Sequence, residues 1–163
     1  MSAKISRIPA STTAPIDEDR SDWSCGYAVV VASGDGRSTE QWARAVWEEA
    51  SAPMRLFLIA GWRLVLGLRL GSRDSADHVL GWKIVHRLPN ETAVEAKSRT
   101  LTAHNTFRRD DQRLVWSTFV RYDRPAARII WPPVSLLHRP LVRYSLRRAA
   151  RRGRAVDATA RGA

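Results

Sequence analysis

The last third of this 163-residue chain, residues 124–154, constrains the fold most, because arginines and apolar residues share a helix-like pattern there. This segment contains nine arginines and no aspartate or glutamate. Pro125 can start a helix, whereas Pro132, Pro133 and Pro140 predict bends, since proline removes a backbone donor and clashes with the preceding turn. Its apolar positions recur at helical spacing, at Leu136, Leu137, Leu141, Val142 and Leu146. The segment therefore predicts a long, bent C-terminal helix.

Directly upstream, the pattern changes to an alternation with period two, which is typical of strands with one buried face. Turn residues separate consecutive runs, with Pro89 and Asn90 after the first and residues 110–112 after the third. Short hairpins therefore connect the strands into an antiparallel meander. The runs lie at residues 79–86, 94–99, 101–108 and 113–122.

The first half of the chain predicts one strand and two shorter helices. The β-branched run at residues 27–31 is typical of a strand. Ser38 or Thr39 can cap a first helix, and Pro53 can open a second helix that extends to Leu66. With five expected strands, the chain belongs to the α+β class: a curved antiparallel sheet closed by the long C-terminal helix, with two shorter helices after the first strand.

The length favours a single domain with a substantial core. Residues 1–22 are rich in serine, threonine and proline, and we expect a mostly irregular arm there, although Ile5 and Ile8 are able to hold part of it against the body. We place the domain at residues 23–152 and expect a flexible basic tail at residues 153–163.

The net charge of +11 is unevenly distributed, because residues 1–50 hold five basic and eight acidic side chains. The C-terminal segment is therefore where an anionic partner is expected, either a membrane surface or an acidic protein. A solvated helix face is the simpler interpretation, and no motif indicates a specific nucleic acid. The candidate contacts are Arg143, Arg147, Arg148, Arg151 and Arg152.

Several features favour a reducing, cytoplasmic setting. A peripheral location at the membrane surface is compatible with it. Cys25 is the only cysteine, which excludes an intramolecular disulfide, and we find no signal-peptide pattern. The longest apolar stretch, residues 53–70, carries three arginines and predicts a helix outside the membrane. Asp74, Asp77 and His78 share a polar loop, but the set is incomplete for a metal, so we expect no metal and no cofactor.

Four stretches carry a resemblance to a known superfamily. Together with the order of elements, they resemble the START-like, polyketide cyclase-like (SRPBCC) helix-grip superfamily, and the residues are most similar to a bacterial family of unknown function within or near it. The resemblance implies a sheet wrapped around the C-terminal helix with an apolar cavity between them. A short additional strand near residues 68–70 fits that pattern. The stretches are residues 19–29 (DRSDWSCGYAV), 79–85 (VLGWKIV), 116–122 (WSTFVRY) and 136–142 (LLHRPLV).

If such a cavity exists, the inward faces of the strands line it with large aromatic side chains and a few polar groups, as an apolar ligand requires. The same rings are equally suited to filling a core. The candidate ligand-binding residues are Trp82, Ile84, His86, Val94, Trp116, Thr118 and Tyr122.

Three functions follow from these patterns. The first is non-catalytic binding of a hydrophobic small molecule, such as a lipid- or polyketide-like compound. The second is a cyclase or dehydratase that uses a cavity histidine as a general base, with His86 and His104 as candidates, whereas His138 is expected to form a hydrogen bond at the helix bend. No dyad partner or nucleophile motif is recognisable, so we favour a protein that is not an enzyme. The third is an interaction protein whose basic C-terminal helix meets a membrane surface or an acidic partner.

Overall fold

The chain forms one antiparallel sheet, and the computed structural model describes residues 4–32 and 34–161, with side chains up to Gly153. Seven strands pair in the order β1-β2-β7-β6-β5-β4-β3. The meander expected from the period-two runs is confirmed, with hairpins at Leu88–Glu91 and Asp110–Arg113. The strands are β1 (Ile5–Ile8), β2 (Trp23–Val30), β3 (His78–Val79), β4 (Trp82–Leu88), β5 (Glu91–Lys97), β6 (Leu101–Asp110) and β7 (Arg113–Tyr122).

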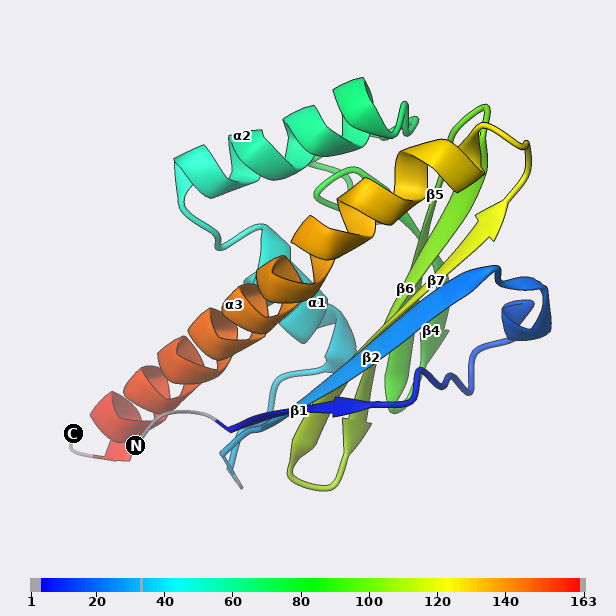
Figure 1. The fold of residues 1–163 in the computed structure, drawn as a ribbon. Coiled ribbons are helices and arrows are strands. Elements are labelled where there is room, and N and C mark those ends of the chain that lie inside the picture. Colours follow the sequence, from blue (N-terminus) through cyan, green and yellow to red (C-terminus); the bar gives the residue numbers. More distant parts are fainter. Residues whose placement is uncertain (1–3, 33, 162–163) are drawn as a thin grey trace.

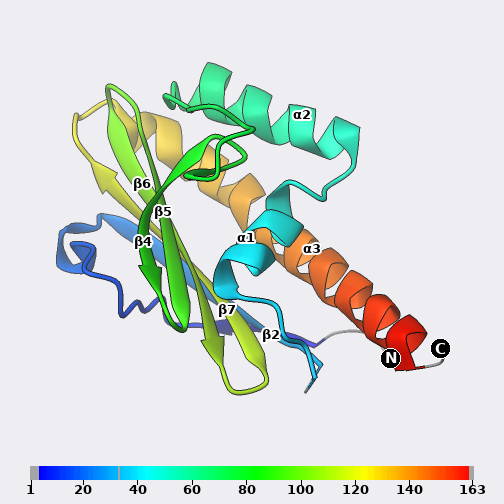
Figure 2. The same cartoon turned by 180° about the vertical axis from the view of Figure 1, so that it is seen from behind.

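The α-helices lie together on one side of the sheet, with the long C-terminal helix crossing it diagonally (Figures 1 and 2). This confirms the expected α+β class and its helix-grip arrangement: a curved sheet, a long C-terminal helix and two shorter helices after β2. The helices are α1 (Thr39–Trp47), α2 (Ala52–Ala60), which continues into a π-helical turn η2 (Gly61–Val65), and α3 (Ala127–Arg161), together with a short 3-10 turn η1 (Glu18–Arg20).

The N-terminal arm is held against the sheet. Residues Ile5–Ile8 form β1, which pairs with β2 so that Ile5 lies opposite Val29. The residues that follow β1 cover the face of the sheet opposite the helices. We call this face the outer face. There Ser11 N donates to Ser117 Oγ at 3.2 Å, and Ser117 is fully buried. Within the described residues 4–22 the arm is mostly irregular, as expected, and its regular elements are β1 and η1.

Glu91 fixes this arm to the first residue of β5. Its side chain is completely buried. It accepts a hydrogen bond of 2.7 Å from Thr13 N and further bonds from the hydroxyl groups of Thr12 and Thr13. These donors compensate for the desolvation of a buried carboxylate, which is otherwise unfavourable.

The sheet has two strands more than the five expected, because β1 and β3 are too short to give a periodic signal. β3 joins β4 through Leu80 and Gly81, which both have positive φ angles, 46° and 90°. Near residues 68–70, the additional strand expected from the helix-grip pattern is a single bridge. Arg69 N donates to Lys97 O at 2.8 Å, and no longer ladder forms.

α3 runs from Ala127 to Arg161 through Pro132, Pro133 and Pro140. Figure 1 shows its axis changing direction between the yellow and orange parts, which agrees with the predicted bend. Ser135 Oγ donates to the Pro132 carbonyl at 2.7 Å, which satisfies an acceptor in the proline-containing turn. The helix continues beyond residue 153, so the boundary predicted there for a flexible tail is not where α3 ends.

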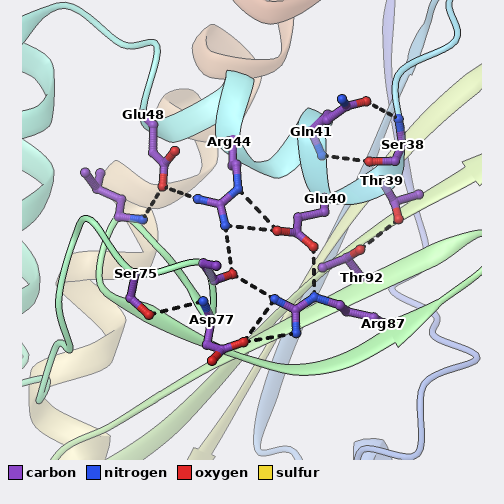
Figure 3. A network of polar contacts seen from close by, with 12 residues as sticks. Ser38, Thr39, Glu40, Gln41, Arg44, Glu48, Ser75, Asp77, Arg87 and Thr92 are labelled. Atoms are coloured by element: carbon purple, nitrogen blue, oxygen red, sulfur yellow. Dashed lines mark hydrogen bonds and ion pairs between the residues drawn. The ribbon is translucent and has the colours of Figure 1, made fainter.

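A polar network joins α1 to the β3–β4 end of the sheet (Figure 3). At the start of α1, Ser38 and Gln41 form a capping box, with Gln41 N donating to Ser38 Oγ at 3.1 Å. One turn later, Arg44 contacts Glu40 and Glu48 at 2.9 Å each. Glu48 also accepts from Leu80 N at 3.0 Å, which attaches the helix to the β3–β4 turn.

Arg87 on β4 completes the network. It contacts Glu40 at 2.9 Å and Asp77 at 3.3 Å. Burial would raise the pKa of Glu40, but hydrogen bonds from Arg87 and Arg44, and the charges of both, outweigh it and lower that pKa. Glu40 therefore stays ionised between two arginines, and α1 is held firmly over the sheet.

Replacing Arg44 with methionine should lower the free energy of unfolding by about 2 kcal/mol, because it leaves two partly buried carboxylates without their shared partner. Urea denaturation followed by tryptophan fluorescence measures this loss. Arg113→Met is the matched control, since the Arg113–Asp110 pair is exposed and is expected to contribute less than about 0.5 kcal/mol. Equal losses in the two variants would contradict this role of Arg44.

Candidate ligand-binding cavity

A small cavity of about 200 Å³ lies between the helix-facing side of the sheet and the helices α2, η2 and α3. None of the side chains that line it belongs to an aspartate, glutamate, lysine or arginine. The lining is predominantly aromatic and aliphatic, which is the composition expected of a site for an apolar molecule. The lining residues are Trp47, Phe57, Leu58, Gly61, Trp62, Val65, Leu66, Trp82, Ala103, Asn105, Trp116, Thr118, Trp131, Val134, Leu137, His138, Leu141, Val142 and Ser145.

Trp47, the last residue of α1, organises the aromatic part of the lining. Its ring centroid lies 5.2 Å from Trp62, 5.4 Å from Trp82, 5.5 Å from Phe107 and 5.7 Å from Trp116. Most of these pairs meet edge to face, the geometry that aromatic quadrupoles favour. The rings therefore form a continuous cluster, and its four tryptophans line one side of the cavity, whereas Phe107 lies behind them in the core.

A polar cluster lies within this apolar lining. Asn105 Oδ1 on β6 accepts from Trp116 Nε1 at 2.8 Å and from Thr118 Oγ1 at 2.6 Å. His138 Nε2 on α3 lies 3.2 Å from Thr118 Oγ1. Because the Thr118 hydroxyl donates to Asn105, its oxygen accepts from His138, and the proton of the neutral imidazole sits on Nε2.

His138 is neutral at ordinary pH. Burial, reinforced by the charge of Arg139, lowers its pKa from 6.5 to about 4. The cavity consequently presents hydrogen-bonding groups without a net charge.

The structure brings three of the seven predicted ligand-binding residues to the cavity, namely Trp82, Trp116 and Thr118. Ile84 and Val94 are buried in the core next to it but do not line it. Tyr122, near the end of β7, is partly buried against the core and is also outside the lining.

His86 faces away from the cavity because of a β-bulge. The β4–β5 register shifts between Ile84, which pairs with Val94, and His86, which pairs with Ala93. Val94 faces the helices, so its neighbour Ala93 faces the other way, and His86 shares that outer face. The prediction that His86 lines the cavity was therefore wrong.

His104 also lies on the outer face, between Glu95 and Phe119 in the strand register. Its Nε2 contacts Glu95 Oε2 at 2.9 Å. Burial lowers the pKa of His104, and the attraction of Glu95 offsets this only in part. The two histidines proposed for catalysis are thus separated from the cavity by the sheet, and the cavity histidine is His138.

Among the polar lining residues, Asn105, His138 and Ser145 were not predicted as part of the site. For His138, a signal exists in α3: Trp131, Val134, His138, Leu141 and Ser145 follow each other at intervals of three or four and all line the cavity. Asn105 occupies an inward position of β6, between Ala103 and Phe107. Its polar side chain at an apolar position was the available clue.

The five arginines of α3 that were predicted to contact an anionic surface divide into two groups. Arg148 donates to the carbonyl groups of Ala45, Val46 and Glu49, and Arg152 donates to Glu49 at 2.7 Å. These two arginines therefore cap the carbonyl end of α1 rather than forming a free anionic-surface contact. Arg143, Arg147 and Arg151 are exposed at successive turns of α3.

The other side chains with reactive or metal-binding groups do not form a second site among the described residues. Asp77 pairs with Arg87, and the His78 ring packs so closely on Gly71 that a Cβ atom there would lie 2.2 Å from Nε2. Within the described ranges, no three His, Cys, Asp or Glu side chains gather where they could hold a metal ion. Burial raises the pKa of the Cys25 thiol to about 11, so it is a poor nucleophile.

Comparison with known proteins finds no matching family model, no matching curated protein and no matching solved structure. Among the helices of the described residues, none has the length and apolarity needed to cross a membrane.

Proposed function

We propose that the protein binds a hydrophobic small molecule, without converting it, in the cavity between the sheet and α3. The observation that carries this proposal is an apolar cavity of about 200 Å³ whose lining includes the hydrogen-bonded cluster Asn105–Thr118–His138. Apolar area supplies affinity in such sites, and a few hydrogen bonds supply orientation. The resemblance to helix-grip proteins agrees with this arrangement.

Fluorescence titration with Nile red, an uncharged apolar dye, tests the proposal. We expect saturable binding with one dye per chain, and we expect Trp116→Ala to weaken it, because this change removes a lining ring and a donor to Asn105. Trp42→Phe serves as a control for changes in a buried tryptophan, since Trp42 is buried but does not line the cavity. A folded protein that shows no saturable binding would contradict the proposal.

The cyclase or dehydratase alternative depends on His138, since His86 and His104 lie on the outer face. The hydrogen bond of His138 goes to Thr118, and its ring neighbours are Trp23, Trp116 and Trp131. None of these groups is an acid that would orient and activate a general base. The surroundings of His138 therefore favour binding over turnover.

A second proposal, contact with an anionic membrane surface, is supported by the exposed apolar residues at the mouth of the cavity. Phe57, Val65 and Leu137 line the cavity and are still 56%, 57% and 65% exposed. Leu64 and Leu136 extend this apolar surface, at 83% and 70% exposure. Apolar side chains of this kind, with arginines nearby on α3, suit the interface of a bilayer that carries anionic lipid.

Co-sedimentation with vesicles tests this contact. We expect binding to phosphatidylcholine vesicles that contain phosphatidylglycerol, and weak binding to vesicles without it. Each exposed arginine near an anionic surface contributes about 1 kcal/mol to the free energy of membrane binding. Replacing both Arg143 and Arg147 with glutamine should therefore weaken binding roughly tenfold to thirtyfold. Arg113→Gln, in the β6–β7 hairpin, is the control. Binding that does not change with the content of anionic lipid or with the salt concentration would contradict the proposal.

A further inference from the structure

The hydrogen bonds of the polar cluster in the cavity lining have a fixed direction. Trp116 Nε1 can only donate, so the Asn105 atom 2.8 Å from it is the acceptor oxygen Oδ1. The same oxygen lies 2.6 Å from Thr118 Oγ1, which therefore gives its single hydrogen to Asn105. His138 Nε2, 3.2 Å from that hydroxyl oxygen, is then the donor of the last bond. The indole of Trp116 thus determines which nitrogen of His138 carries the proton.

The other ring nitrogen of His138, Nδ1, is consequently an acceptor without a hydrogen. A neutral imidazole has a single N–H group, and the low pKa of His138 keeps the ring neutral. Nδ1 forms no hydrogen bond within the described part of the chain. It is also not one of the unpartnered polar atoms whose surface is completely covered, so part of its surface remains accessible.

The accessible side of the His138 ring borders the cavity. His138 lines the cavity, and its side chain is only partly covered. Its other sides are occupied, because Thr118 contacts Nε2 and the rings of Trp23, Trp116 and Trp131 lie at centroid distances of 5.6, 6.4 and 5.8 Å. Burial nevertheless lowers its pKa, as expected of a side chain that lies deep in the protein beside an internal space. A molecule in the cavity is therefore placed to reach Nδ1.

Nδ1 differs from the other polar groups of the lining in what it requires. Ser145 Oγ can donate or accept, and the amide nitrogen of Asn105 can donate, so both can serve a ligand oxygen. Nδ1 can only accept, so it needs a ligand that has a hydrogen to donate. Because none of the described lining residues is charged, an ammonium donor would lack a counter-charge there. A hydroxyl group is uncharged, donates through its hydrogen and accepts through its oxygen, and so matches both kinds of lining group.

We infer that the ligand is an uncharged, largely apolar alcohol or phenol, whose hydroxyl group donates a hydrogen bond to Nδ1 of His138. This inference rests on the proposed binding function and specifies its ligand class. It distinguishes alcohols and phenols from hydrocarbons, ketones and esters of the same size, none of which has a hydrogen to donate.

2-Naphthol and 2-methylnaphthalene provide a matched pair of probes, because a hydroxyl group replaces a methyl group on the same ring system. We expect calorimetric titration at neutral pH to give affinities within about threefold of each other for the wild-type protein, since the bond to Nδ1 offsets the cost of removing the hydroxyl group from water. His138→Phe keeps a ring of similar size without a nitrogen. In this variant 2-naphthol should bind about tenfold more weakly than 2-methylnaphthalene, because a buried donor without a partner is unfavourable.

His86→Phe is the matched control for this variant. It makes the same substitution on the outer face of the sheet, so the affinities for both probes should equal those of the wild-type protein. Urea denaturation of both variants verifies that they are folded under the conditions of the titration.

NMR spectra of the ¹⁵N-labelled wild-type protein test the same contact without a variant. Long-range ¹H–¹⁵N correlation distinguishes protonated from unprotonated ring nitrogens and should show the hydrogen of His138 on Nε2. Adding 2-naphthol should move the Nδ1 signal upfield, the direction expected when an unprotonated imidazole nitrogen accepts a hydrogen bond. 2-Methylnaphthalene should leave this signal in the range of a free acceptor.

The outcomes separate this inference from the proposed function. A hydrogen found on Nδ1, or an Nδ1 signal that does not respond to 2-naphthol, would overturn the inference and leave the binding function standing. The same holds if the affinity ratio of the two probes is unchanged in His138→Phe, or if Ser145→Ala changes it and His138→Phe does not. Failure of both naphthalenes and of Nile red to bind to the folded protein would overturn the proposed function itself.

Discussion

Replacing Gly61 with phenylalanine is expected to lower the affinity for Nile red at least tenfold without destabilising the protein. Gly61 opens η2 and lines the cavity. Its backbone is helical, with φ of −59° and ψ of −46°, and a Cβ atom there would meet no atom within 4 Å beyond its chain neighbours and the backbone of its own helix. A Cβ atom therefore fits without a clash, and we expect a phenylalanine ring at this lining position to take up space that the ligand needs.

The stability of the Gly61 variants separates blockage from unfolding. Glycine in a helix is less favourable than alanine by roughly 0.5–1 kcal/mol, so Gly61→Ala should raise the free energy of unfolding by about that amount. Its single methyl group should change Nile red affinity by less than about twofold. If a folded Gly61→Phe protein binds the dye as tightly as the wild type, the ligand does not occupy this cavity.

Acid is expected to destabilise the protein through His138, by about 3 kcal/mol between neutral pH and about pH 4. The folded-state pKa of His138 is about 4, below its ordinary value of 6.5. Between these two values the unfolded chain binds the proton more readily, so protonation favours unfolding and stability falls as the pH falls. A difference of 2.5 pKa units, at 1.36 kcal/mol each, gives the size of the effect.

His138→Gln isolates this contribution from those of the acidic residues. Glutamine does not titrate, so its urea denaturation should show a pH dependence that is shallower by about 3 kcal/mol over the same range. The comparison is made between the two proteins at each pH, because both share every other titrating group. Identical pH profiles would show that His138 is not held neutral in the folded state.

The elements with strong local signals were predictable from the sequence. Pro89 and Asn90 indicated the β4–β5 hairpin, Ser38 indicated the start of α1, and the period-two runs indicated the meander. β1 and β3 were missed because their residues form strands only by pairing with β2 and β4. The prolines of α3 were expected to bend the helix, and the chain tolerates them without ending it.

The cavity was predictable on its sheet side and less so on its helix side. Trp82 and Trp116 followed from alternation along single strands. One extra residue between Ile84 and His86 reverses the face of every later side chain in β4, and alternation alone does not reveal such a bulge. The role of Arg148 depends on where the end of α1 meets α3, which is a tertiary contact without a sequence signal.

Native mass spectrometry of the purified protein, beside its denatured mass, tests the central claim most directly. We predict that the wild-type protein carries or takes up one apolar compound, whose mass is lost on denaturation. The Gly61→Phe protein, measured in parallel, should carry none. If the wild-type protein is empty and takes up none of the apolar probes under conditions where it is folded, then the cavity is not a binding site and the claim is wrong.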